Sequence, residues 1–149
     1  MSITDEELLA VAIADARTGL AEGGIPIGAA LAHDGVLLGS GHNRRVQLGS
    51  PIRHGETDCL ENVGRLPAST YAACTMATTL SPCDMCTGAI LLYGIPRVVV
   101  GENDTFMGGE ELLRSRGVEV VVVNSEECMA MMRDFIAAYP QLWNEDIGV

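Results

Sequence analysis

The chain has 149 residues, of which 48% are hydrophobic and 19% charged, and its formal net charge is −11. These values are typical of one soluble globular domain with a sizeable core, and they exclude a disordered segment. The negative charge argues against a polynucleotide partner, because nucleic-acid binding draws much of its affinity from basic contacts.

The expected order of secondary-structure elements is α-β-β-α-β-α-β-α-β-α. Thr4 and Glu7 form a capping-box pattern ahead of apolar residues at helical spacing, and Asp34-Gly35 is a strong signal for a hairpin turn. In chain order, the expected elements are a helix over 4–20, strands over 27–33 and 36–42, a loop over 43–53, a helix over 54–63, a strand over 70–78, a helix over 84–93, a strand over 97–101, a helix over 109–116, a strand over 118–123 and a helix over 125–139.

The element order indicates a mixed sheet. A helical connection between the last two strands implies a right-handed crossover and parallel pairing. The valine-rich segment 118–123 fits a sheet that is covered on both faces. We therefore predict a three-layer α/β/α sandwich around a five-stranded mixed sheet, formed as one domain over residues 1–149.

A split motif carries the chemistry: His54-Gly55-Glu56 and, further along, Cys83-Asp-Met-Cys86. One imidazole and two thiols are three good zinc ligands, and three ligands leave open the fourth position that a catalytic zinc site needs. Glu56 is then a spare carboxylate, able to move protons to and from an activated water. Cys83 and Cys86 share one helix face at this spacing, whereas His54 and Glu56 do not. The motif therefore predicts two helix N-termini that converge on one Zn²⁺ ion, with Gly55 allowing close backbone approach.

Each half of the motif has an alternative interpretation. A lone Cys-x-x-Cys can be a redox pair or half of a structural zinc site, but a redox pair would not need His54 or Glu56. A structural site would need a fourth ligand, for which His33 and His42 are the candidates. We favour the catalytic site, because His-x-Glu followed by Pro-Cys-x-x-Cys is the signature of zinc-dependent nucleobase deaminases.

Nearly the whole chain resembles the small zinc-dependent cytosine deaminases of the fungal type. Besides the motif, the matching segments are 22–28, 41–43, 60–65, 78–90, 93–97, 100–103 and 143–148. The resemblance implies that His54, Cys83 and Cys86 bind zinc and that Glu56 is the proton shuttle. The substrate-binding residues that it implies are Asn43, Gly55, Ser81, Phe106, Trp143 and Asp146.

Within this set the resemblance implies separate roles. Asn43 and the backbone of Gly55 would hold the ring carbonyl, and Asp146 would accept hydrogen bonds from a ring N–H and the amino group. Phe106 and Trp143 would close over the ring. Without the resemblance, Trp143 and Asp146 would be interpreted as a frayed terminus and Phe106 as a loop anchor.

The expected reaction is the hydrolytic deamination of free cytosine, or of an analogue such as 5-methylcytosine, to uracil and ammonia. The alternatives are deamination of guanine, isocytosine or creatinine, editing of adenosine in tRNA, and a non-catalytic zinc or redox module. The resemblance also implies a homodimer with helix 84–93 at its interface, although Met85, Ala89 and Leu92 are equally consistent with a core face.

Two features bear on the substrate and its surroundings. Thr57-Asp58-Cys59 departs from the Ile-Ser-Thr of the fungal enzymes, and Asp104-Thr105 departs from their Val-Asn. Asp58 could alter recognition of the ring edge or face solvent, and we expect solvent. The arginines at 44, 45 and 53 are interpreted as a solvated loop face rather than a polynucleotide track, so the expected substrate is a free small molecule.

The expected location is the cytoplasm, with no membrane association. No apolar run approaches the length of a membrane span, and the acidic N-terminus lacks the regions of a signal peptide. Cys59, Cys74 and Cys128 lie in apolar surroundings and are expected to be buried as reduced thiols.

Overall fold

A five-stranded mixed sheet forms the centre of the molecule in a computed structural model that describes residues 2–149. The strands lie in the order β2-β1-β3-β4-β5. The pairs β1–β2 and β1–β3 are antiparallel, whereas β3–β4 and β4–β5 are parallel, as the crossover argument predicts for the last two strands. The strand bounds are β1 Gly28–His33, β2 Val36–His42, β3 Cys74–Leu80, β4 Arg97–Glu102 and β5 Glu119–Val122.

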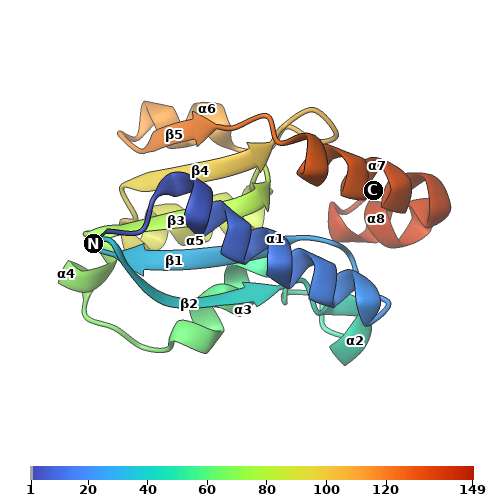
Figure 1. The fold of residues 1–149 in the computed structure, drawn as a ribbon, viewed down its shortest axis with the longest axis horizontal. Helices are drawn as coiled ribbons and strands as arrows, with labels where there is room; N and C mark the ends of the chain where they lie inside the picture. Colours follow the sequence, from blue (N-terminus) through green and yellow to red (C-terminus); the bar gives the residue numbers. More distant parts are fainter. Residues whose placement is uncertain (1) are drawn as a thin grey trace.

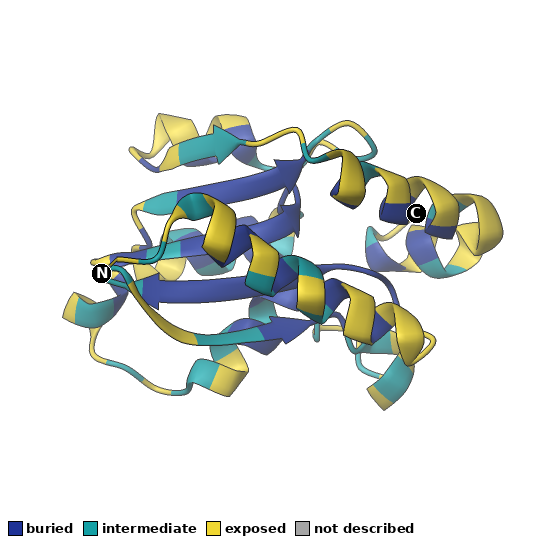
Figure 2. Cartoon of the chain, in the orientation of Figure 1, coloured by how far each residue is buried: buried dark blue, intermediate teal, exposed yellow. Residues whose placement is uncertain are grey.

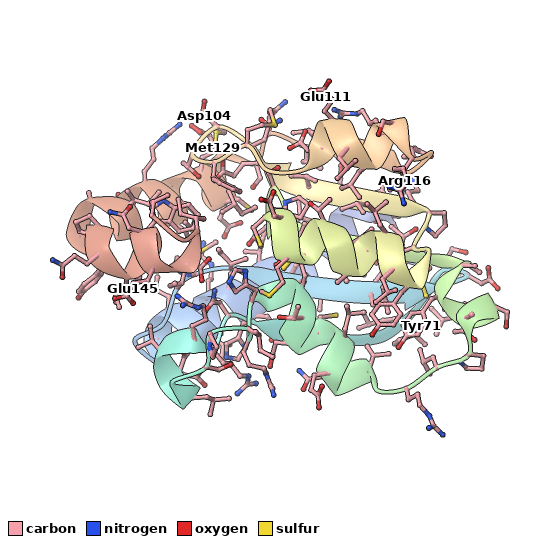
Figure 3. The ribbon with its side chains drawn as sticks, turned by 180° about the vertical axis from the view of Figure 1, so that it is seen from behind. Tyr71, Asp104, Glu111, Arg116, Met129 and Glu145 are labelled. Atoms are coloured by element: carbon pink, nitrogen blue, oxygen red, sulfur yellow. The ribbon has the colours of Figure 1, made fainter. Side chains whose placement is uncertain are left out.

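Helices cover both faces of this sheet, which confirms the predicted three-layer sandwich (Figure 1). Helix α1 crosses one face, with α7 packed beside β4, while α3, α5 and α6 lie on the opposite face, which Figure 3 shows from behind. The helix bounds are α1 Asp5–Ala21, α2 Arg45–Leu48, α3 Gly55–Val63, α4 Ala68–Tyr71, α5 Asp84–Tyr93, α6 Glu110–Ser115, α7 Glu126–Ala138 and α8 Pro140–Asp146. Within residues 2–149, no helix has the length and hydrophobicity needed to cross a membrane.

Alternation along the strands separates two apolar layers. Leu31 and Met76 belong to the layer on the α3 and α5 side, whereas Ala30 and Ala77 belong to the layer under α1. The small residues let α1 approach the sheet closely: a Cβ built on Gly28 would lie 2.0 Å from the carbonyl oxygen of Ala12. Figure 2 shows the central strands buried along most of their length. Full burial of each large apolar side chain contributes about 1.5–3 kcal/mol to folding.

The local signals at the chain's turns are confirmed. The hydroxyl of Thr4 accepts a hydrogen bond from the Glu7 N–H at 3.1 Å, and the Glu7 carboxylate accepts one from the Thr4 N–H at 3.0 Å. Asp34 and Gly35 have φ values of 47° and 80°, as a tight hairpin turn with two left-handed residues requires. These contacts start α1 and set the register of β1 against β2.

Three predicted boundaries are wrong. The strand expected over 70–78 is Cys74–Leu80, because Tyr71 belongs to α4, stacks 5.1 Å from the ring of Tyr93 and donates a hydrogen bond to the carbonyl of Gly64. Tertiary packing here overrides the β-propensity of Thr70 and Tyr71. The loop over 43–53 contains the helical turn α2, and a further helix, α8, begins at Pro140 after the last predicted one.

Candidate active site

The N-termini of α3 and α5 meet at one point, as the motif predicts. His54 is the N-cap of α3, Cys83 is the N-cap of α5, and Cys86 lies in the first turn of α5. The Nδ1 atom of His54 lies 3.4 Å from the Sγ atom of Cys83 and 3.8 Å from that of Cys86. One donor atom from each of the three residues lies within 4.8 Å of the other two.

This cluster fits a zinc ion. With Zn–N and Zn–S bonds of about 2.0 and 2.3 Å, tetrahedral geometry separates nitrogen and sulfur donors by about 3.5 Å, which is close to the two observed distances. Among residues 2–149, no further His, Cys, Asp or Glu completes the cluster. The Nε2 atom of His42 instead bonds Glu22 at 2.9 Å, and His33 lies at the hairpin end of β1. The fourth ligand of a structural site is therefore missing from the described chain.

The two thiols differ in their protonation. Hydrogen bonds with Cys86 and, to a smaller extent, with His54 lower the pKa of Cys83 to about 4, although burial acts in the opposite direction. The bond to Cys83, together with burial, raises the pKa of Cys86 well above its usual value. The pair therefore shares one proton, which a bound dication replaces when both sulfurs become ligands.

Glu56 lies in the first turn of α3 and lines a cavity beside the cluster. Its side chain is buried, with only 4% of the residue exposed. Burial, with a smaller contribution from the charge of Cys83, raises the pKa of Glu56 to about 7. A carboxyl group whose pKa lies near neutrality can both accept and release a proton, as a shuttle must.

Two aromatic rings close the cavity. Its lining includes His54, Glu56, Ser81, Phe106, Trp143 and Asp146. The rings of Phe106 and Trp143 meet edge to face, with centroids 5.7 Å apart at 82°. The enclosed volume is about 10 Å³, room for about one water molecule. A base can therefore enter only when Phe106, Trp143 or both move aside.

Asp146 and Asn43 meet at the edge of this cavity, although 103 residues separate them in the sequence. The Asn43 Nδ2 donates to the Asp146 Oδ1 at 2.8 Å, and the same oxygen lies 3.4 Å from the Nε2 of His54. The Asn43 Oδ1 accepts the backbone N–H of Arg45 at 3.0 Å, so the carboxamide has a fixed orientation with its N–H groups toward Asp146. Burial raises the pKa of Asp146 against the opposing charge of His54 and the Asn43 bond.

The α8 helix explains how the C-terminal residues reach the site. Pro140 stands in its first turn, a favoured position because proline lacks a donor that would have no partner there. Trp143 and Asp146 are buried, with Trp143 in an apolar cluster that includes Ile27 and Phe135. The frayed-terminus interpretation is therefore wrong.

The Ser81 hydroxyl already has hydrogen-bond partners within the protein, unlike a group that is free to bind a substrate. It donates to the Oε2 of Glu110 at 2.7 Å and accepts the N–H of Gly108 at 2.9 Å. Both functions of the hydroxyl are therefore used to hold the loop that carries Phe106. Gly55 lies against the residue that precedes β1, where a Cβ would stand 3.0 Å from the carbonyl oxygen of Ile27.

Two buried carboxylates that sequence analysis missed hold the loop between β4 and α6. Glu102 accepts the N–H groups of Asp104 and Thr105 at 2.8 and 2.9 Å, and also the Thr105 hydroxyl. Glu110 binds Ser81 and, through its other oxygen, the side chain of Asn103. The available signal was a glutamate directly after the apolar run of β4.

Asp58 does not face solvent, so that expectation is wrong, and it does not line the ring-binding cavity. It is fully buried on the face of α3 that packs against β2, where Arg44 and Arg53 bind it. The arginines are consequently not a solvated loop face: Arg45 has its guanidinium 3.9 Å from Asp146, and the other two pair with Asp58. Their positions are set by long-range carboxylates that local charge patterning does not reveal.

Comparison with known proteins gives a consistent result. Residues 2–102 match the model of the cytidine and deoxycytidylate deaminase zinc-binding region. The chain is 56% identical to the cytosine deaminase of Candida albicans over 149 residues, which cover 99% of both proteins. It is 33% identical to the tRNA-specific adenosine deaminase of Streptococcus pyogenes serotype M18 over 103 residues, 68% of this chain and 65% of that protein.

A solved structure shares the fold at lower identity. The guanine deaminase of Nitrosomonas europaea superposes with a TM-score of 0.72 at 22% identity, over 91% of this chain and 86% of that one. At this identity the similarity concerns the arrangement of strands and helices. The sandwich is therefore a fold that this chain shares with that protein.

Proposed function

We propose that this chain, which belongs to the family of deaminases with a cytidine and deoxycytidylate deaminase zinc-binding region, converts free cytosine and water into uracil and ammonia. The observation that carries the proposal is the placement of Glu56, the three-ligand cluster and the Asn43–Asp146 pair beside one small cavity. The 56% identity with a cytosine deaminase over nearly the whole chain supports the same substrate.

In this proposal His54, Cys83 and Cys86 hold one Zn²⁺ ion, which supplies the Lewis acidity that activates a water molecule. Glu56 accepts a proton from that water and delivers it to ring N3, which makes C4 more electrophilic. A C–O bond forms at C4, Glu56 carries the remaining proton of the added hydroxyl to the amino group, and the C4–N bond breaks with release of ammonia, which leaves a carbonyl at C4. Glu56 lines the same cavity as His54 and Cys83, so one carboxylate is placed for both transfers.

The polar groups at the cavity can bind the polar groups of cytosine. The free N–H of the Asn43 carboxamide and the backbone N–H of Gly55 donate to the ring carbonyl. Asp146 accepts a hydrogen bond from the ring N–H or from the amino group, which lie on opposite sides of the ring. Phe106 and Trp143 cover the ring and exclude water, and Ser81 keeps the Phe106 loop in place.

Because the closed cavity holds only about 10 Å³, ring movement must enlarge it before any base fits. Arg44 and Arg53 both pair with Asp58, which neutralises part of the local positive charge that a tRNA substrate would use. We therefore infer a free nucleobase as substrate, with a single catalytic domain over residues 1–149.

The decisive assay measures ammonia release from cytosine, 5-methylcytosine, isocytosine, guanine, adenosine and creatinine, with zinc quantified in the same sample. We expect about one zinc per chain and turnover of cytosine and 5-methylcytosine. Stoichiometric zinc without cytosine turnover would reject the substrate while leaving the metal site intact. Turnover that persists in Glu56→Gln would reject the proton-transfer role.

We also propose a homodimer through α5. Its outer face is not a core face: Leu92 is 75% exposed, and Met85, Ala89 and Leu92 line an open groove of about 840 Å³ between α3 and α5. Light scattering during size-exclusion chromatography tests this. Leu92→Glu should give monomers, whereas Leu112→Glu, at an exposed position on α6, should not. Equal masses for Leu92→Glu and the parent chain at micromolar concentration would reject this interface.

The proposed compartment is the cytoplasm. Five cysteines have no disulfide partner, and two of them must remain reduced to bind zinc. Subcellular fractionation in the source cells tests this assignment, with recovery in an oxidising secretory fraction as the opposing result.

A further inference from the structure

Asp58 is the centre of a polar network outside the cavity. Its Oδ2 accepts the backbone N–H of His42 at 3.0 Å, the Nε of Arg44 at 3.1 Å and the side chain of Asn62 at 3.3 Å. Its Oδ1 accepts the Nε of Arg53 at 2.9 Å and a second guanidinium hydrogen bond from the same residue. A fully buried carboxylate with this many donors is a rigid anchor, because the donors of His42, Arg44 and Arg53 would lose their partner if the loop moved.

The groups that Asp58 binds flank the segment that carries Asn43. His42 precedes Asn43 directly, Arg44 follows it, and Arg53 ends the loop that contains α2. The N–H of Arg44 also donates to the carbonyl of Arg53 at 2.9 Å, which closes the base of this loop. Both ends of the loop are therefore attached to one side chain of α3, the helix that also carries Glu56.

Close packing makes this attachment specific. A Cβ on Gly41 would stand 2.7 Å from the Asp58 Oδ2 and 2.5 Å from the N–H nitrogen of Cys59, so the end of β2 lies directly against α3. Burial by itself raises the pKa of Asp58, but the His42 N–H and the Arg53 and Arg44 guanidiniums outweigh it and lower the pKa overall. The anchor is therefore ionised at neutral pH.

The orientation of the Asn43 carboxamide depends on this loop. Its Oδ1 is held by the N–H of Arg45, and its backbone N–H donates to the carbonyl of Ile27 at 2.9 Å. Its Nδ2 then meets Asp146 at 2.8 Å. A shift of the 42–53 loop would rotate the carboxamide away from the cavity and break this contact.

We propose that Asp58 is a positioning residue for substrate recognition, whose buried carboxylate holds the 42–53 loop so that the Asn43 carboxamide meets both Asp146 and the ring carbonyl of the substrate. This inference rests on the proposed deaminase function for its kinetic consequence only. It assigns a specific role to a residue outside both the metal cluster and the cavity lining.

The test is a double-mutant cycle of Asp58→Asn and Asn43→Ala, with zinc content and thermal unfolding measured for each variant. We expect Asp58→Asn to lower kcat/KM for cytosine by about ten- to hundredfold through misplacement of a binding group, with zinc retained. In the Asn43→Ala background the same change should alter kcat/KM less than twofold. The matched control is Asp134→Asn, which removes an exposed carboxylate from α7 and should leave kcat/KM unchanged.

A second measurement does not depend on turnover. The side-chain NH₂ signal of Asn43 in ¹⁵N-labelled protein, identified by its loss in Asn43→Ala, should shift in Asp58→Asn. The NH₂ signal of Asn62, a direct partner of Asp58, should also shift and shows that the network has changed. A wild-type chain that does not deaminate cytosine would refute the proposed function, whereas the Asn43 signal still tests the positioning role.

The opposing results are specific. An equal fall in kcat/KM in both backgrounds would show a general structural effect and overturn the positioning role. An Asn43 signal that stays in place while the Asn62 signal shifts would overturn it as well. If Asp58→Asn does not fold, Arg53→Gln removes one partner of the same carboxylate. The NH₂ signal of Asn43 in that variant then tests the positioning role by the same criteria.

Discussion

Replacement of Glu102 by Gln tests whether the buried carboxylate holds the Phe106 loop closed. Glu102 is buried between β4 and the loop and accepts two backbone N–H groups at 2.8 and 2.9 Å. The glutamine is similar in size and keeps one carbonyl oxygen, but it carries no charge. The substitution therefore weakens the existing hydrogen bonds without creating a cavity.

The two hydrogen bonds to the loop backbone set the size of the effect, because they hold its main chain, whereas the third, from the Thr105 hydroxyl, holds only a side chain. A hydrogen bond to a charged group contributes about 1.5–3 kcal/mol, against about 0.5–1.5 for a neutral pair. Loss of the charge should therefore cost about 1 kcal/mol for each bond and about 2 kcal/mol in total. If this free-energy cost falls entirely on the closed form of the loop, the ratio of closed to open loop becomes about thirtyfold smaller.

The assay is steady-state deamination of cytosine, together with zinc content and thermal unfolding. We expect kcat/KM to fall by up to about thirtyfold, with zinc retained, because Phe106 closes the cavity only when its loop is in place. Glu111→Gln, an exposed glutamate on α6, is the control and should behave as the parent chain. Unchanged kcat/KM in a Glu102→Gln protein with clearly lower thermal stability would refute the link between this carboxylate and loop closure.

Three further predictions concern the proton shuttle, the metal and an ion pair. Glu56→Gln should retain zinc and lower kcat by at least about 10²–10⁴-fold, since general acid–base catalysis contributes that much; normal zinc content with near-normal turnover would contradict it. Removal of zinc by a chelator should lower both activity and Tm, and added Zn²⁺ should restore both, because binding free energy contributes to folding; an unchanged Tm in protein shown to be metal-free would be inconsistent. Asp5→Asn should destabilise the chain by about 0.5–1 kcal/mol near pH 7, because the half-exposed Asp5 binds Arg97 through two hydrogen bonds of 2.6 and 2.7 Å. Those bonds lower the pKa of Asp5 below 3.8, so its contribution is present above that pH and is lost as the pH falls through the folded-state pKa; denaturant unfolding at pH 7 and pH 3 should therefore give a difference between the two chains that shrinks in acid.

Local sequence determines the elements and the metal cluster. The capping box at Thr4, the turn at Asp34-Gly35 and the valine-rich strands act over a few residues, so their structures are predictable without tertiary information. The spacings within His54-x-Glu56 and Cys83-x-x-Cys86 require helix N-termini directed at one ion. The structure has that convergence.

The substrate cavity follows from tertiary structure. The contact between Asn43 and Asp146 spans 103 residues, and a helix that begins at Pro140 brings Asp146 to it. Residues near the C-terminus have no local pattern that predicts burial, because it is the packing of Trp143 against Ile27 and Phe135 that buries them. The family resemblance pointed to these residues, and the fold supplies the physical reason.

Buried carboxylates are the clearest case in which only the tertiary structure decided. Asp58, Glu102 and Glu110 look like ordinary surface acids in sequence, and the loop arginines look like a solvated group. In the fold Asp58 and Glu110 are buried among donors from other segments, and Glu102 is buried against the N–H groups of the loop that follows it. A charge leaves water only where partners are already placed to receive it, and the partners of Asp58 and Glu110 are assembled by the packing of whole helices and strands.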